Sequence, residues 1–537
     1  MLTMLDRVQY YLLFFICSTL IICTTPQVLR LSISGGLSSK LSWYFIFIGI
    51  VVTILFRHKY VFEQRQEITL PLKYICAYLF FSLMSLLIGL YNFPFYDAVF
   101  NAPVAQFDRA HLLHDFLKEY GINIESNHFF LIWMVFRLIR NLLLETIYTF
   151  GASYCIYIWF RNKEDLCIRA LLRGILAAVV VILVYTVVEI PYVFYNNEYC
   201  KAILTFLNPI LHDIKDGGTW WPPLLWPDIR IRSVFAEPSY LGIYMAFAMP
   251  WLWYMMISKK HYRANLFMAV IILLNTFLVF LTKSRTGIVI LIGELLLLSL
   301  VAVYFFKIKD FKSLFRNIAI ICLSFAAFIG ANFLIEHSSF DRTNESQKSN
   351  IEIQKQVESY VSENVSSLRS SDKRSNRARF SIMIANLNIG VEHPILGVGP
   401  SLRQAYVIHY LPTEAFEDNE VRGWIQNQKA KGVFKGSFPS LGEYTTRFAE
   451  TGLFGILLFL LPPISLIFKI LKIILTQNPV SENDYVLLYY LISLLGILAT
   501  GIGESLNVTY CYWILLGIGF VLTINRERKL CVDKGKL

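Results

Sequence analysis

Charged side chains are scarce in this 537-residue chain, at 16% of all residues, whereas 56% are hydrophobic. Soluble globular domains have about 25% charged residues, so this composition excludes an ordinary soluble protein. The net charge of +11 does not point to nucleic acid, because the lysines and arginines form short clusters between apolar runs of about 20 residues. We therefore interpret the charge as a signal of membrane topology and expect no nucleic-acid partner.

Paired cysteines and processing signals are also lacking. The nine cysteines are scattered, most of them in apolar runs, with no spacing typical of a metal site or a disulfide framework. No small-residue cleavage site follows the first apolar stretch, which begins near Tyr10. We expect this stretch to remain as a membrane helix rather than to be removed as a signal peptide.

Long apolar runs dominate the sequence, and twelve of them are long enough to cross about 30 Å of hydrocarbon. They lie near residues 8–25, 42–56, 72–91, 129–160, 170–192, 236–258, 263–282, 286–306, 316–335, 452–476, 484–504 and 508–524. The sequence therefore predicts an all-α polytopic integral membrane protein with about 12 transmembrane helices.

Basic residues indicate the orientation of these helices. Clusters of lysine and arginine follow the even-numbered runs, near residues 57–65, 161–163, 259–263 and 307–316. Because cytoplasmic loops are enriched in lysine and arginine, both termini are predicted to be cytoplasmic. The segments 92–128, 193–235 and 336–451 then face the opposite side.

The chain accordingly divides into three parts. Residues 1–335 carry helices one to nine with two shorter outer loops, 336–451 form a large loop without internal repeats, and 452–537 carry helices ten to twelve. Within the large loop, apolar residues at helical spacing predict a helix between residues 350 and 379. Residues 200–212 have a similar pattern and fit either an interfacial helix, followed by Trp220, Trp221 and Trp226 at headgroup level, or simple packing of the loop.

A polar run precedes the sixth helix and includes Arg230, Arg232, Glu237 and Pro238. Proline suits the first turn of a helix, and a carboxylate before it would lie at the positive end of the helix dipole. A simple helix cap would explain the same residues. Two arginines within seven residues of a carboxylate at a membrane surface favour a site.

The short turn between helices seven and eight reads Lys283-Ser284-Arg285-Thr286-Gly287. These cations lie on the outer side, against the positive-inside tendency. The guanidinium of Arg285 could bind a diphosphate through paired hydrogen bonds, or Lys283 and Arg285 could anchor the helices in the headgroup region.

The large loop holds a third group of candidates, beginning with Arg379 and the segment His393 to Pro400, which contains Gly-Val-Gly. Such glycines would let backbone N–H groups approach a ligand, although a plain tight turn fits as well. Arg403 follows, and Glu450 lies near the entrance of the tenth helix. We interpret His409 as a solvated loop histidine.

Ionisable residues inside the fourth helix are the fourth group. Arg137, Arg140, Asn141 and Glu145 fall on one helix face by their spacing. Charged groups at membrane depth usually face a cavity and mark function. Alternatively, Arg140 and Glu145 neutralise each other while Arg137 reaches the membrane surface. Glu504, at the end of the eleventh helix, is a similar but weaker candidate.

In this order, four short segments resemble the O-antigen polymerase and O-antigen ligase superfamily of membrane glycosyltransferases. The matching segments are residues 235–242 (FAEPSYLG), 284–287 (SRTG), Arg379 with 393–399 (HPILGVG), and 449–455 (AETGLFG). Together they cover roughly the C-terminal 310 residues. The N-terminal part matches only in being hydrophobic.

The resemblance implies a bacterial inner-membrane enzyme with a large periplasmic loop, working without a metal or other cofactor. Its partners would be undecaprenyl-diphosphate-linked glycan donor and acceptor, membrane lipid, and a protein that regulates chain length. The implied reaction is polymerisation of lipid-linked repeat units into O-antigen or a related surface polysaccharide. Ligases carry a His-Asn pair where this chain has Leu441-Gly442, which favours a polymerase.

We assign roles to these candidates by the chemistry that the reaction requires. A departing diphosphate needs fixed cations, and an acceptor hydroxyl needs a base. The expected catalytic residues are Glu237 and, as second candidate, His393. The expected ligands of the substrate and its diphosphate are Arg230, Arg232, Arg285, Arg379, Arg403 and Glu450. The expected polar residues within the membrane are Arg137, Arg140 and Glu145.

Two other functions fit part of the pattern. A ligase that transfers glycan to lipid A core shares almost all of these features. A transporter or flippase of a lipid-linked polysaccharide would also have about twelve helices with buried charges, although no inverted repeat is visible and the large late loop is unusual for a transporter.

Overall fold

The computed structural model describes residues 3–31, 38–56, 65–102, 105–213, 230–258, 261–336, 374–476 and 485–534. Within these ranges all regular secondary structure is helical. Every apolar run named above coincides with a helix. These helices are α1 (Met4–Thr19), α2 (Leu41–Leu55), α4 (Arg65–Tyr91), α7 (Ser126–Thr146) continued by η4 (Ile147–Gly151) and α8 (Ala152–Phe160), α9 (Glu164–Tyr195), α11 (Pro238–Ser258), α12 (Tyr262–Leu281), α13 (Arg285–Lys307), α14 (Phe311–Glu336), α19 (Glu443–Thr476), α20 (Tyr485–Thr500) and α21 (Cys511–Lys534).

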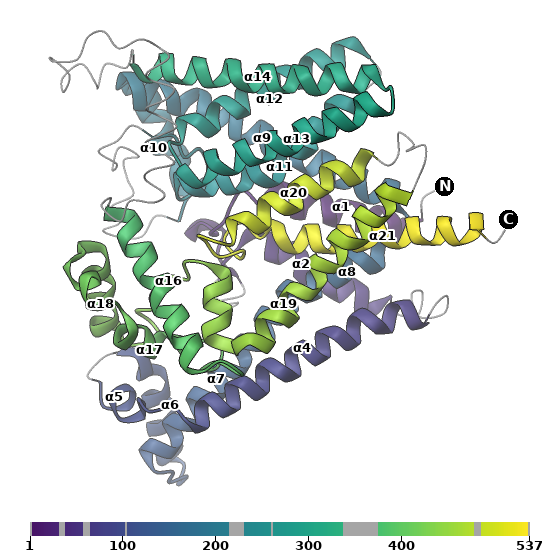
Figure 1. The fold of residues 1–537 in the computed structure, drawn as a ribbon. Coiled ribbons are helices and arrows are strands. Elements are labelled where there is room, and N and C mark those ends of the chain that lie inside the picture. Colours follow the sequence, from purple (N-terminus) through teal and green to yellow (C-terminus); the bar gives the residue numbers. More distant parts are fainter. Residues whose placement is uncertain are drawn as a thin grey trace.

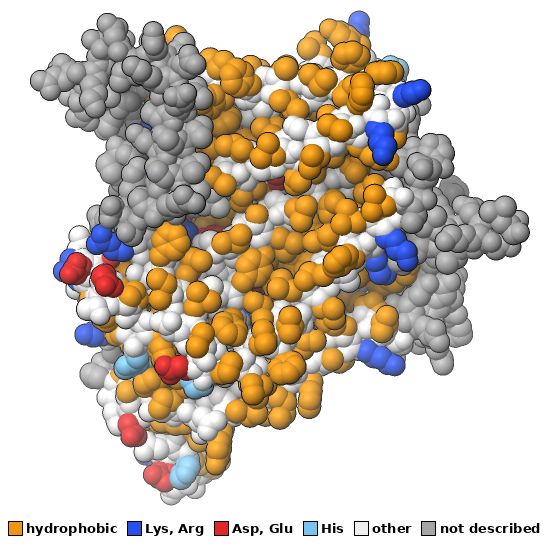
Figure 2. Space-filling model, viewed as in Figure 1, with side chains coloured by type: hydrophobic (Ala, Val, Ile, Leu, Met, Phe, Trp, Pro, Cys, Tyr) orange, Lys and Arg blue, Asp and Glu red, His pale blue; other side chains and the backbone are white. Residues whose placement is uncertain are grey.

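Seven helices in the described parts of the chain are long and apolar enough to cross a membrane, namely α4, α9, α11, α12, α13, α14 and α19. The apolar parts of α2, α20 and α21 are shorter. One side of the molecule carries a broad band of hydrophobic side chains along the helices (Figure 2). On α13, Leu296, Leu300 and Val303 are each about two-thirds exposed, which is the pattern of a helix face in contact with lipid. The composition and these exposed faces indicate a polytopic membrane protein.

Shorter helices connect the long ones. They are η1 (Gln27–Leu29), α5 (Tyr96–Phe100), η3 (Ala105–Phe107), α6 (Asp108–Glu119), α10 (Glu198–Leu211), α16 (Arg374–Glu392), α17 (Arg403–Tyr410), η6 (Thr413–Glu417) and α18 (Asn419–Lys431). In Figure 1 both chain termini lie at one end of the long helices, and α5, α6, α10, α17 and α18 lie at the other end. The three segments expected on a common side of the membrane therefore share one end of the molecule.

Helix α11 forms the centre of the main core. Of its most apolar stretch, 89% is buried, compared with 22% for α14. The side chains of Tyr244, Trp251 and Trp253 are fully buried, where α11 contacts α12, α13 and α20. The segment before α11, which holds Glu237, is thus fixed to the most buried helix of the protein.

The described part of the large loop has a second core of its own. Ile382 and Ile389 of α16, together with Val407 of α17, pack in one cluster with Phe130 and Leu138 of α7. Helices α16 and α17 also contact α19, so this part of the loop packs against one of the long apolar helices. The cluster thus includes residues of α7, the helix that also carries Arg137, Asn141 and Glu145.

The start of α19 differs from the sequence expectation. Helix α19 begins at Glu443, nine residues before the expected position, and is broken at Gly452, which has φ 64° and ψ −166°. The polar run that looked like loop is the first part of a kinked helix. The expected helix at 350–379 and the three tryptophans lie outside the described residues, except for 374–379, which begin α16. Residues 200–211 lie in helix α10, which packs against α9 and η1, so the segment is a helix that also packs on the rest of the protein.

Candidate active site

The first two sequence segments of interest meet where α11 crosses α13. A Cβ atom added to Gly242 would lie 2.8 Å from the Cα of Gly287, so neither position has room for a side chain. The backbone N–H of Ile231 also donates to the carbonyl of Leu281, at 3.2 Å. Residues 230–242 and 284–287, which flank α12 and most of α11 in the sequence, are therefore in direct contact.

A buried carboxylate of α9 holds the arginine-containing segment before α11 in place. Glu189 is 0% exposed and accepts hydrogen bonds from the backbone N–H groups of Arg232 (3.1 Å) and Ser233 (2.8 Å). Ser233 has a positive φ of 52°, a conformation that L-residues adopt rarely and that these two bonds stabilise. The sequence reading overlooked Glu189, although an acidic residue within an apolar run is a recognisable signal.

Arg379 contacts one carboxylate from a distant part of the chain, Glu504, and acts electrostatically on a second, Glu237. One of its guanidinium nitrogens (Nη1) is 3.4 Å from Oε1 of Glu504 and 3.3 Å from the carbonyl of Gly503. Its positive charge also acts on Glu237, whose Oε2 accepts a hydrogen bond from Ser239 at 3.2 Å. Glu504, which the sequence indicated only as a weaker candidate, is thus the carboxylate that pairs directly with Arg379.

Both carboxyl groups lie outside the membrane-spanning segments, before α11 and after α20, and both have raised pKa values. Burial raises the pKa of Glu237, an effect that Arg379 and Ser239 oppose. Burial raises the pKa of Glu504 to about 7, and the nearby charge of Glu237 adds to the increase while Arg379 opposes it. A carboxyl group that titrates near neutral pH is suited to proton transfer.

The glycine-containing segment after α16 packs against the kink of α19. The N–H groups of Val398 and Gly399 donate to the carbonyls of Ala449 and Glu450, both at 2.9 Å. A Cβ atom on Gly397 would lie 2.4 Å from the carbonyl carbon of Glu450. The expectation that these N–H groups approach a ligand is therefore wrong: the glycines allow two backbones to pack closely.

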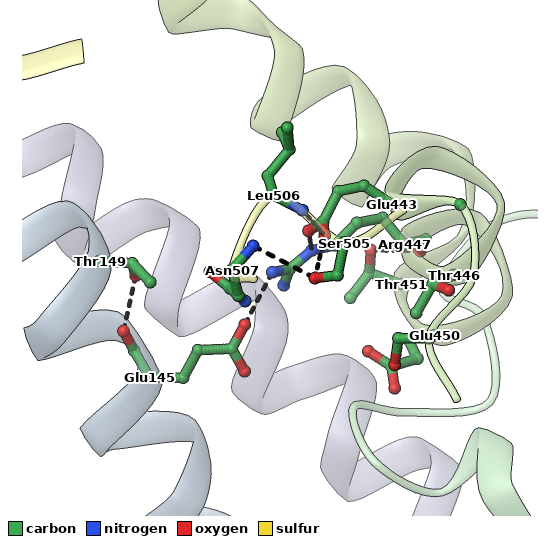
Figure 3. Close-up of polar contacts among 12 residues, drawn as sticks. Glu145, Thr149, Glu443, Thr446, Arg447, Glu450, Thr451, Ser505, Leu506 and Asn507 are labelled. Atoms are coloured by element: carbon green, nitrogen blue, oxygen red, sulfur yellow. Dashed lines mark hydrogen bonds and ion pairs between the residues drawn. The ribbon is translucent and has the colours of Figure 1, made fainter. Parts of the chain in front are cut away.

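Arg447, in the first part of α19, is the centre of a charged network (Figure 3). Its Nη2 is 2.7 Å from Oε1 of Glu145, and its Nε is 2.8 Å from Oε1 of Glu443. The other oxygen of Glu443 accepts hydrogen bonds from Ser505 Oγ (2.8 Å) and from the N–H of Leu506 (3.1 Å). The network joins α7, α19 and the loop after α20, and Ser505 connects it to the neighbouring Glu504.

A polar cavity of about 270 Å³ adjoins this network. The cavity is lined by Arg137, Leu138, Asn141, Glu145, Ser401, Gln404, Val433, Phe434, Ser437, Ser440, Glu443, Thr446, Arg447, Glu450, Ser505 and Asn507. Glu450 accepts a hydrogen bond from the N–H of Ser401 at 3.1 Å. Its carboxylate lies 3.9 Å from the Nε atom of the fully buried Arg403. Burial lowers the pKa of Arg403, and the carboxylate of Glu450 opposes this effect.

The polar residues of helix α7 are only partly as expected. Arg137, Asn141 and Glu145 line the cavity, but Arg140 is exposed and donates to Asn141 at 3.2 Å. The alternative in which Arg140 neutralises Glu145 is wrong, because Glu145 pairs with Arg447. A partner 302 positions away could not be found from helical spacing.

The remaining candidates lie apart from the cavity. His393 packs edge-on against Tyr406, with ring centres 5.8 Å apart, and does not line the cavity. His409 is exposed, as expected, but it lies in the last turn of α17 rather than in a loop, and its ring stacks on Phe95 with ring centres 4.8 Å apart. Arg285 is half-buried in the first turn of α13, and Arg230 and Arg232 belong to the segment held by Glu189. The structure thus places most of the expected cations near one end of the helices, with His393 outside the polar network.

Arg447 and Glu443 are the main residues that the sequence reading missed. Their spacing of four residues on one helix is an ordinary sign of an ion pair. They were passed over because residues 443–451 read as loop. Among the described residues, no group of three or more histidine, cysteine or acidic side chains is arranged to hold a metal ion.

Comparison with protein families relates part of the chain to a known family. Residues 267–460 match the family model described as O-antigen ligase. No curated protein matches the chain significantly. The matched range includes Arg285, Arg379, Arg403, Arg447 and Glu450. This match supports a relationship to the superfamily of O-antigen polymerases and ligases, which are glycosyltransferase-like membrane enzymes of polysaccharide biosynthesis, and does not distinguish one from the other.

Proposed function

We propose that this protein is an O-antigen polymerase of the bacterial inner membrane. It joins undecaprenyl-diphosphate-linked repeat units into a surface polysaccharide on the periplasmic side. The single observation that carries this proposal is the pairing of Arg379 with Glu504 at a distance from which its charge also acts on Glu237. A cation that can stabilise a departing diphosphate lies there beside a carboxylate that can accept a proton.

In the proposed reaction, an acceptor hydroxyl attacks the anomeric carbon of the lipid-linked donor. A new glycosidic C–O bond forms as the bond from the anomeric carbon to the diphosphate oxygen breaks. Glu237 accepts the proton of the hydroxyl, and the diphosphate leaves with the bonding electron pair. Arg379 stabilises the added negative charge, with Arg232 and Arg285 as further diphosphate ligands.

The space around residue 442 supports a polymerase over a ligase. Gly442 has φ 80°, and an added Cβ atom would lie 2.9 Å from Thr445 Oγ1 and 3.0 Å from the carbonyl of Ile502. The asparagine of the ligase-type His-Asn pair would therefore not fit at this position without movement of the backbone. The description of the matching family as O-antigen ligase keeps ligation as the second candidate.

The test is the lipopolysaccharide ladder of a strain that lacks the gene, complemented with wild type or with Glu237→Gln. We expect core with one repeat unit in the deletion strain, restoration by wild type, and no restoration by Glu237→Gln at equal expression. A full ladder with Glu237→Gln would exclude this residue as the base. Accumulation of long lipid-linked polymer without attachment to core would instead establish a ligase, and an unchanged ladder in the deletion strain would favour a transporter.

A further inference from the structure

The polar cavity holds one cation that the charged network does not neutralise. Arg447 pairs with Glu145 and Glu443, and Arg403 lies beside Glu450. The guanidinium of Arg137 lies on the same cavity and forms no ion pair with any carboxylate in the described parts of the chain. Arg137 therefore differs from Arg403 and Arg447, each of which lies beside a carboxylate.

The contacts of Arg137 leave most of its donors unused. Its Nη2 donates to the carbonyl of Phe434 at 3.2 Å, and the guanidinium carbon lies 5.8 Å from the centre of the Phe434 ring. A guanidinium has five N–H donors, so these contacts fix its position without saturating it. Arginine held in this way is suited to bind a carboxylate through two parallel hydrogen bonds.

The other lining residues match a ligand rich in hydroxyl groups. Serine and amide side chains surround the cavity, contributed by Asn141, Ser401, Gln404, Ser437, Ser440, Ser505 and Asn507. Such groups both donate and accept hydrogen bonds, as sugar hydroxyls do. The ring of Phe434 is half-buried at the cavity and adds an apolar surface beside these polar groups.

The charges favour one negative group rather than several. Glu145, Glu443 and Glu450 also line the cavity, and they would repel a diphosphate. A single unpaired guanidinium matches a single carboxylate. On the basis of the proposed polymerase function, we propose that this cavity binds a sugar unit of the glycan that carries a carboxylate, and that Arg137 binds that carboxylate.

The position of the cavity suits this role. Ser505, which lines it, bonds to Glu443 and directly follows Glu504, the partner of Arg379. A saccharide in the cavity would therefore lie beside the place where the proposed glycosyl transfer occurs. Arg137 would determine which repeat unit is accepted, without taking part in bond formation.

Binding to the purified full-length protein in detergent tests the proposal separately from polymerisation. The probes are glucuronic acid, glucose and inorganic pyrophosphate, and the readout is saturation-transfer NMR with competition. We expect glucuronic acid to bind more tightly than glucose to wild type. We expect Arg137→Gln to weaken glucuronic acid binding about tenfold, because it removes a charge-assisted pair, and to leave glucose binding unchanged.

Two further variants make the result specific. Arg137→Lys keeps the charge but loses the paired geometry, so it should retain only part of the preference for the acid. Arg109→Gln, which changes an exposed arginine of α6, should bind like wild type. Equal binding of glucuronic acid by wild type and Arg137→Gln would overturn the proposal, as would pyrophosphate binding that depends on Arg137 without any binding of the acid. Either result would leave the ladder test of polymerase activity unaffected.

Discussion

Arg447 of α19 and Glu145 of α7 form an ion pair of 2.7 Å across 302 positions of sequence. The Arg447 side chain is 11% exposed, and Glu443, its second partner, is 4% exposed. The pair thus fixes the kinked start of α19 to a helix from the first third of the chain.

Replacing Arg447 should destabilise the protein strongly. Arg447→Gln would leave Glu443 buried without its cation, a change that costs on the order of 3 kcal/mol or more. We expect a marked fall in the thermal denaturation midpoint of the purified protein. Arg422→Gln, which alters an exposed arginine of α18, is the control and should change stability by less than about 0.5 kcal/mol. Equal stability of the two variants would mean that the network contributes little.

A methyl group at Gly397 should prevent correct folding. The residue has φ 66°, and an added Cβ atom would lie within 2.5 Å of three backbone atoms of Glu450 and Thr451. Backbone atoms cannot move aside as a flexible side chain can, so Gly397→Ala should reduce the yield of monodisperse protein severely. Gly423→Ala in α18 has no atom within 4 Å of its new methyl group and should be produced like wild type. Normal yield of Gly397→Ala would show that the contact between the two segments can relax.

Changing the shape of the cation at residue 379 should slow the transfer reaction. Arg379→Lys keeps the positive charge but cannot contact Glu504 and a diphosphate with the same planar geometry. We expect the rate of chain extension on purified lipid-linked repeat units to fall about tenfold or more. Arg422→Lys provides the matched control. A rate equal to wild type in Arg379→Lys would reduce Arg379 to a structural role.

The pKa of Glu504 predicts a pH dependence of stability. The folded protein raises this pKa from 4.5 to about 7, so it binds the proton more tightly than the unfolded chain does. The associated stabilisation is complete below pH 4.5 and is lost as the pH rises towards about 7, by roughly 3 kcal/mol at most. Glu504→Gln removes this contribution.

Denaturation midpoints of wild type and Glu504→Gln between pH 4.5 and 8 measure this effect. The difference between the two proteins should change in favour of the glutamine variant as the pH rises. Glu417→Gln, at an exposed position, should run parallel to wild type. A constant difference between wild type and Glu504→Gln across the range would show that Glu504 titrates at its ordinary value.

The helices could be predicted from the sequence because lipid requires long apolar segments, and these are visible without any partner. All twelve apolar runs coincide with helices, although only seven of the helices in the described ranges meet the length and hydropathy expected of a membrane span. The start of α19 was missed because residues 443–451 are polar. Their helical form depends on contacts with distant residues, among them the bond from the N–H of Glu443 to the carbonyl of Gly501, at 2.8 Å.

Several residues of the candidate site could be predicted from the sequence, but the contacts that bring them together could not. The segments around Glu237, Arg379 and Glu450 stood out because charge and glycine are unusual next to apolar runs. These segments are brought together by contacts between residues that lie far apart in the sequence, and a local sequence pattern carries no information about such contacts. Glu189 and Arg447 therefore escaped notice, and His393 received more weight than its contact with Tyr406 supports.

The bonds between Glu443 and residues 501–506 also determine when this site can form. The chain is synthesised from its N-terminus, so α7 and the first part of α19 enter the membrane before Gly501, Ser505 and Leu506 exist. Glu443 then has no acceptor for its N–H and only part of its carboxylate contacts. The polar cavity is completed only with the last loop of the protein, so a nascent or C-terminally truncated chain would have most of its helices in place without an assembled site.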